Sequence, residues 1–93
     1  MTRQQLINIR NEFKSFKSNV KANGGIKSDA EQEQSDKLWD SYRDAIIEYC
    51  KENEIVNYVD GEEYEIDWRL ADACVAEDAY GDTEFFDSII GLG

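Results

Sequence analysis

The stretch SDAEQEQSDKLWDSYRDAIIEYCKEN, residues 28–53, decides the fold of this chain because it carries two helical patterns at once. Apolar residues recur at steps of three and four, which predicts one buried helix face. They are Leu38, Trp39, Tyr42, Ala45, Ile46, Tyr49 and Cys50. Carboxylates recur at steps of four on the opposite side, at Asp36, Asp40, Asp44, Glu48 and Glu52. We therefore expect a long amphipathic helix with a row of outward negative charges.

This carboxylate row, defined as those five acids, opposes helix formation. Residues four apart are neighbours, and like charges there repel by roughly 0.2–0.5 kcal/mol per pair. Four pairs cost on the order of 1–2 kcal/mol, against the ~5–15 kcal/mol that stabilises a small domain. A regular row kept despite this repulsion resembles the edge of a nucleic acid more than an enzyme site. The alternative is that the row is only the solvent-exposed face of an amphipathic helix.

A second long helix is predicted over residues 2–23. Thr2 and Gln5 form a capping-box pattern at its start, and Ser28 with Glu31 repeats that pattern before the next helix. A heptad seam follows at Leu6, Ile9, Phe13, Phe16 and Val20, flanked by the bases Arg10, Lys14, Lys17 and Lys21. We expect the seam to pack on the 28–53 helix and the bases to reach acids elsewhere. A homodimer contact through the seam stays open, and Ile47 lies outside the main apolar face.

A β-hairpin is predicted over residues 55–67, because Asp60-Gly61 is a strong two-residue turn signal. The turn pairs Asn57 with Tyr64 and puts one apolar set on the core face: Ile55, Val59, Tyr64 and Ile66. Three hairpin acids, Glu62, Glu63 and Glu65, are expected to form a second acidic patch. A marginal two-stranded hairpin must pack on a helix.

The C-terminal part predicts short helices. Asp67 can cap a helix over residues 68–80, with Leu70, Ala71, Cys74 and Val75 on its buried side. A last turn or two should follow through Phe85, Phe86, Ile89 and Ile90. The expected fold is α+β and mostly helical: one acidic domain over residues 1–93, with two long helices, one hairpin and short C-terminal helices.

Composition argues against catalysis and metal binding. The chain has 93 residues, no histidine and two isolated cysteines, so the commonest general base and a CxxC zinc pattern are both lacking. The acids Asp78, Asp82, Glu84 and Asp87 lack the spacing of a calcium loop. We expect no catalytic residue, no cofactor and no metal. With no signal peptide or membrane-length apolar run, a cytoplasmic protein with reduced thiols is expected.

Charge is segregated along the chain. The formal net charge is −11, with +5 on residues 1–27 and −16 on residues 28–93. Such a field repels nucleic acid and anionic membranes and attracts basic protein surfaces. The expected partner is therefore a basic protein, with neither direct nucleic-acid binding nor membrane binding.

In size, lack of histidine and acidic rows, the chain resembles the phage-encoded DNA-mimic inhibitors of host defence. Within these it is most similar to the Arn-type anti-restriction proteins of T-even phages, including the opening MTRQQLINIRNEF and the tail GDTEFFDSII. The resemblance implies a decoy in the cytoplasm of the host cell, directed at the restriction nuclease McrBC or the histone-like protein H-NS. It implies no site residue by correspondence, and the basic first helix departs from a uniformly acidic mimic.

Two other functions fit the sequence. One is a structural or adaptor module that binds a protein through an apolar and aromatic face, formed by Trp39, Tyr42, Phe85 and Phe86. The other is an antitoxin-like inhibitor of a basic protein. The DNA-mimic interpretation assigns partner binding to the carboxylate row and to the hairpin acids.

Overall fold

The computed structural model describes residues 1–79, which hold three helices and two strands. In chain order these are α1 (Arg3–Ala22), α2 (Asp29–Glu52), β1 (Val56–Val59), β2 (Glu62–Glu65) and α3 (Trp68–Ala79). The mostly helical fold with one antiparallel hairpin is therefore as the sequence predicts. The helical turns expected through residues 85–90, together with Asp82, Glu84 and Asp87, lie outside the described residues.

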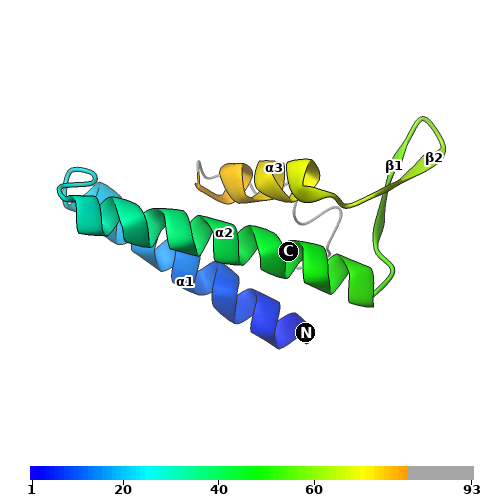
Figure 1. The fold of residues 1–93 in the computed structure, drawn as a ribbon, viewed down its shortest axis with the longest axis horizontal. Coiled ribbons are helices and arrows are strands. Elements are labelled where there is room, and N and C mark those ends of the chain that lie inside the picture. The colour runs from blue at the N-terminus through cyan, green and yellow to red at the C-terminus, as the bar shows by residue number, and fades with distance from the viewer. Residues whose placement is uncertain (80–93) are drawn as a thin grey trace.

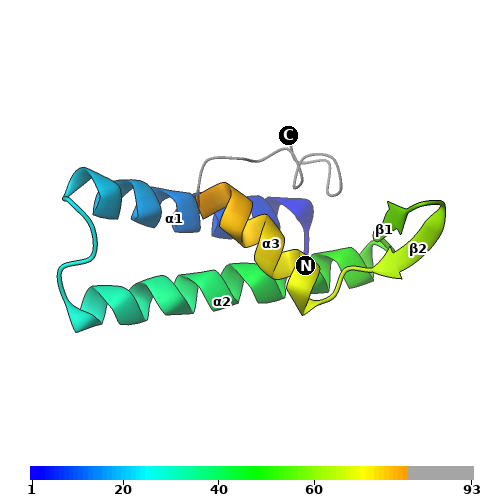
Figure 2. The ribbon, with the colours of Figure 1, turned by 90° about the horizontal axis from the view of Figure 1, so that it is seen from above.

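The helices form one bundle with the hairpin at its end. The long helices α1 and α2 lie side by side, and α3 packs on α2 and reaches α1 (Figure 1). Seen from above, α3 crosses between the two long helices, while β1 and β2 project beyond the C-terminal end of α2 (Figure 2). None of the helices within residues 1–79 has the length and apolar character needed to cross a membrane.

The helix starts follow the predicted caps. At α1 the capping box is complete: the Gln5 amide donates to Thr2 Oγ1 at 3.1 Å, and the Thr2 amide donates to Gln5 Oε1 at 2.7 Å. At α2 the Glu31 amide donates to Ser28 Oγ at 3.1 Å. The Glu31 carboxylate instead accepts from the Lys27 amide at 3.3 Å, so the second predicted box is only half formed.

The core lies where the three helices meet. Its buried residues include two from the α1 seam, Leu6 and Phe13, and the predicted α2 face supplies most of the rest. The Phe13 ring lies edge-on to Trp39 at 6.0 Å and tilted against Tyr42 at 5.4 Å. Burying one such side chain contributes ~1.5–3 kcal/mol. The seam therefore packs within the chain, as expected, and Ile47 is half-buried against this core.

The hairpin has the predicted turn and register but not the predicted burial. Asp60 and Gly61 both have positive φ, and Asn57 pairs with Tyr64. Of the set expected on the core face, Ile66 is buried and Ile55 half-buried, but Val59 and Tyr64 are each 47% exposed. That part of the prediction is wrong because the hairpin projects past α2, so only its base reaches the core.

Candidate partner-binding surface

The carboxylate row lies on the outer side of α2, and all five members are exposed. The cause is the amphipathic pattern, because the opposite side of α2 is buried against α1 and α3. The structure therefore brings the row to the surface as the sequence predicts.

The row is not straight. A four-residue step turns an α-helix by about 400°, so each carboxylate is offset by about 40° from the one before. Over its ~24 Å length the row winds through about 160°. Its last member therefore reaches the flank of α2 beside α1, where the Met1 amino group pairs with the Glu52 carboxylate. At the other end, Asp36 Oδ1 accepts from Gln32 Nε2 at 2.9 Å.

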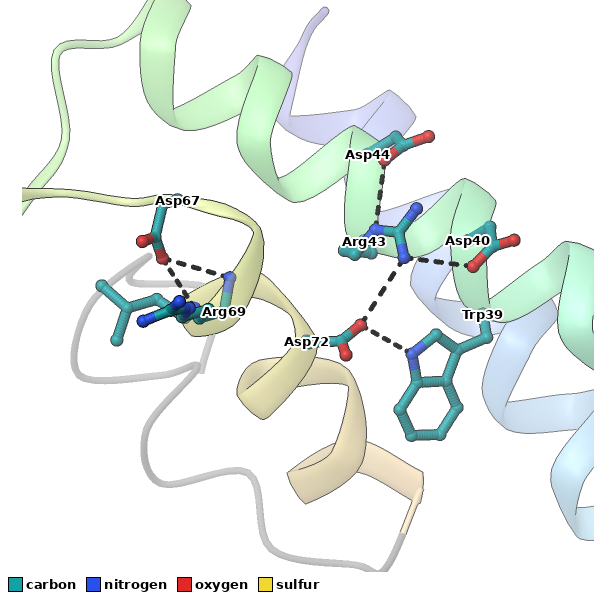
Figure 3. Close-up of polar contacts among 8 residues, drawn as sticks. Trp39, Asp40, Arg43, Asp44, Asp67, Arg69 and Asp72 are labelled. Carbon is teal, nitrogen blue, oxygen red and sulfur yellow. Dashed lines mark hydrogen bonds and ion pairs between the residues drawn. The ribbon is translucent and has the colours of Figure 1, made fainter.

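Arg43 lies between the middle of the row and α3 (Figure 3). Its Nη1 is 3.2 Å from Asp40 Oδ1, and its Nε is 3.3 Å from Asp44 Oδ1. The same Nη1 is 3.8 Å from Asp72 Oδ1, which also accepts from Trp39 Nε1 at 2.9 Å. One guanidinium thus faces three carboxylates, and the cluster stays net negative with Asp40 60% and Asp44 68% exposed at the side chain.

Two of the bases that flank the α1 seam are directed into the bundle. Arg10 pairs with Asp78 of α3, its Nε lying 3.1 Å from Oδ2. Lys17 Nζ donates to Ser35 Oγ at 2.9 Å and lies 5.8 Å from the ring centres of both Phe13 and Trp39. Among residues 1–79, no ion pair joins a lysine of α1 to the carboxylate row. The lysines of α1 therefore do not cancel the row, whose last member, Glu52, pairs with the Met1 amino group.

Asp78 is buried in the structure, although the sequence did not place it on the buried side of the helix over residues 68–80. Besides Arg10, it receives a hydrogen bond from the Tyr42 hydroxyl. Burial is the main cause that raises the pKa of Tyr42 well above its usual range, and this hydrogen bond raises it further. Ala71, Cys74 and Asp78 lie on one stripe of the helix, and this spacing could have predicted that Asp78 is buried.

The aromatic docking face of the adaptor interpretation is only partly available. Tyr42 is fully buried and Trp39 is half-buried, while Phe85 and Phe86 lie outside the described residues. Tyr42 therefore serves the core and cannot contact a partner on that face.

The three hairpin acids are exposed but do not form one patch. Glu63 and Glu65 lie on one face of the hairpin and Glu62 on the other, because side chains alternate along a strand. Glu63 accepts from the Tyr58 hydroxyl at 3.0 Å, which raises the pKa of Tyr58, and Glu62 accepts from the Tyr64 hydroxyl at 2.8 Å. The hairpin acids lie beyond the end of α2, so they extend the negative surface of the carboxylate row along the axis of that helix.

The two cysteines are free, and both are buried in the core. Burial raises the pKa of Cys50 to about 11 and that of Cys74 to about 12, so both thiols stay protonated near neutral pH. Within the described range, no group of three His, Cys, Asp or Glu side chains could hold a metal ion. Comparison with known proteins adds no relative, since no family model, no curated protein and no solved structure matches this chain.

Proposed function

We propose that this protein is a DNA mimic that occupies the basic DNA-binding site of a host protein and so blocks it. The observation that carries the proposal is the carboxylate row, which is exposed along the outer side of α2 while Arg10 and Lys17 of α1 are engaged inside the bundle. A basic cleft that normally holds phosphates would meet a comparable series of anions there.

The geometry of the row resembles that of a DNA strand in its hand and differs from it in its spacing and repeat. Its charges are about 6 Å apart along the axis, against about 3.4 Å between the charges of one DNA strand. Its offset of about 40° per step makes a right-handed spiral with a repeat of about 54 Å. Duplex DNA is also right-handed, with a turn of about 34–36 Å. The row is therefore sparser and less tightly wound than a DNA strand, but it has the same hand.

The partner class under this proposal is a basic DNA-binding protein of the host. The family resemblance points to the restriction nuclease McrBC and to H-NS as the two proteins to test first. Blocking either would counteract a host function that depends on DNA binding.

The proposal is tested by displacement of a labelled DNA duplex from McrBC and from H-NS, measured by fluorescence anisotropy. The row variant carries Asp40→Asn, Asp44→Asn and Glu48→Gln. Its matched control carries Glu12→Gln, Glu33→Gln and Glu54→Gln, three exposed acids outside the row. Both variants lose the same three charges from the net charge of −11.

We expect the unmodified protein to displace the duplex, the row variant to lose about tenfold or more in potency, and the control to stay within about twofold. Equal losses in the two variants would mean that bulk charge, and not the row, causes the displacement. A protein that displaces DNA from neither target would remove these two partners from the proposal. Failure against other basic DNA-binding proteins as well would remove the proposal itself.

A further inference from the structure

A groove with a volume of about 480 Å³ opens between one face of the hairpin and the start of α3. Its apolar surface comes from Val59 and Tyr64 of the hairpin and Leu70 of α3, and the polar residues Asn57, Glu65 and Asp67 also line it. Val59 and Tyr64 are each 47% exposed, and together with Leu70 they line the same groove. The groove is therefore formed by apolar side chains that the bundle itself does not bury.

The surroundings of the groove are strongly negative. Residues 54–68 contain six acids and no base. One base, Arg69 at the start of α3, also lines the groove, and its guanidinium lies 5.5 Å from the centre of the Trp68 ring. Glu62 lies beside Tyr64 and accepts a hydrogen bond from the Tyr64 hydroxyl at 2.8 Å. An occupant must therefore combine an apolar side chain with positive charge.

Charge excludes two other occupants. The C-terminal residues 80–93 are apolar in part but carry three acids and no base. A second copy of the chain brings a net charge of −11. Both would be repelled by the acidic surroundings of the groove, whereas a cationic segment would be attracted.

We infer that the groove docks an extended segment of a partner protein in which lysine or arginine alternates with apolar residues. One apolar side chain lies between Tyr64 and Leu70, and the flanking cations reach Glu62 and Asp67. None of these residues belongs to the carboxylate row, so this surface stands apart from the proposed DNA mimicry.

The probe is an acetylated and amidated peptide, Gly-Lys-Val-Lys-Leu-Lys-Val-Lys-Gly, and the control peptide has every lysine replaced by glutamine. Binding to the full chain is followed by fluorescence anisotropy and by amide shifts in ¹⁵N NMR spectra. Tyr64→Thr removes the aromatic wall of the groove. Tyr58→Thr is the matched control, because Tyr58 is also an exposed hairpin tyrosine bound to a glutamate but lies on the opposite face.

We expect the lysine peptide to shift amides of residues 57–70 and to bind about tenfold or more weakly to Tyr64→Thr. Tyr58→Thr should stay within about twofold, and the glutamine peptide should bind about tenfold or more weakly than the lysine peptide. Val59→Thr, which keeps a β-branched side chain, gives a second reading if Tyr64→Thr disturbs the hairpin amides.

Three results would overturn the inference: equal losses in the two tyrosine variants, equal binding of the two peptides, or shifts confined to α2. The row variant, with Asp40→Asn, Asp44→Asn and Glu48→Gln, should keep peptide binding within about twofold. Loss of DNA displacement with retained peptide binding would separate the two surfaces. If the row variant instead kept DNA displacement and lost peptide binding, the peptide would bind at the row, and both the groove and the row-based mimicry would be removed.

Discussion

Arg10 and Asp78 lie 68 residues apart in the chain and form a two-point ion pair inside the bundle. The guanidinium Nε is 3.1 Å from Oδ2, and Nη2 is 3.3 Å from Oδ1. The Tyr42 hydroxyl donates to the same carboxylate, so one buried anion joins α1, α2 and α3. A paired buried charge adds little net stability, but removing one partner leaves the other charge uncompensated.

The first prediction concerns this pair. Asp78→Asn should lower the free energy of unfolding by about 3–5 kcal/mol, because the mostly buried Arg10 guanidinium loses this carboxylate charge. Urea denaturation at pH 7 measures the loss. Asp72→Asn is the control, since Asp72 is half-exposed and should change stability by about 1 kcal/mol or less. Equal losses in the two variants would show that the burial of Asp78 does not determine how much it contributes to the free energy of unfolding.

The second prediction concerns alkaline pH. The unfolded thiols ionise near pH 9, whereas burial raises the pKa of Cys50 to about 11 and of Cys74 to about 12. The stability contributed by the neutral thiols is complete below pH 9 and is lost as the pH rises from 9 through 12. The free energy of unfolding should fall by up to about 1.4 kcal/mol per pH unit for each thiol.

Urea denaturation at pH 7, 9 and 10 under reducing conditions measures that slope. The double variant Cys50→Ala, Cys74→Ala should show a shallower fall between pH 9 and 10. Tyr42, whose pKa is also raised, is present in both proteins, so its contribution cancels when the two slopes are compared. An unchanged slope in the double variant would argue that other groups control alkaline unfolding.

The third prediction concerns helix capping. Ser28→Ala should lower the free energy of unfolding by about 1 kcal/mol, because the Glu31 amide loses its acceptor at the start of α2. Ser28→Asp keeps an acceptor and should retain most of the stability. Thermal denaturation followed by circular dichroism compares the three proteins. A Ser28→Asp variant as unstable as Ser28→Ala would argue against the cap.

The fourth prediction separates the base of the hairpin from its tip. Ile66→Ala should lower the free energy of unfolding by about 2–5 kcal/mol, because Ile66 is fully packed in the core. Val59→Thr at the exposed tip should change it by about 0.5 kcal/mol or less. A large loss from Val59→Thr would mean that the tip packs on the bundle in solution.

The fifth prediction concerns salt. If the carboxylate row is the binding surface, raising the salt from about 0.1 M to about 1 M shortens the screening length from about 10 Å to about 3 Å. Direct binding of the protein to its target, measured at each salt concentration without DNA, should then weaken by about tenfold or more. An affinity that persists across this range would indicate an interface governed by apolar contacts.

Local features were predictable from the sequence because their causes are local. The cap at Thr2, the periodicity of α2 and the Asp60-Gly61 turn each depend on residues within a few positions of one another. The outward direction of the carboxylate row follows from the same helical period. These features needed no knowledge of how the elements pack.

Long-range placements were not predictable in the same way. Asp78 was left out of the predicted buried side of its helix because its partners, Arg10 and Tyr42, lie 68 and 36 residues away. Tyr64 and Val59 were placed on the core face because alternation fixes which side chains share a face but not where the hairpin sits. To predict whether Val59 and Tyr64 are buried, one also needs the direction that the chain takes after α2.

The winding of the carboxylate row limits the shape of any receptor that uses all of it. A flat surface laid against α2 touches only the members that point toward it, and about 160° separates the first from the last. Contact with Asp36 and Glu52 together requires walls on two sides of the helix. A receptor for the complete row must be a trough deep enough to enclose about half of the α2 cylinder.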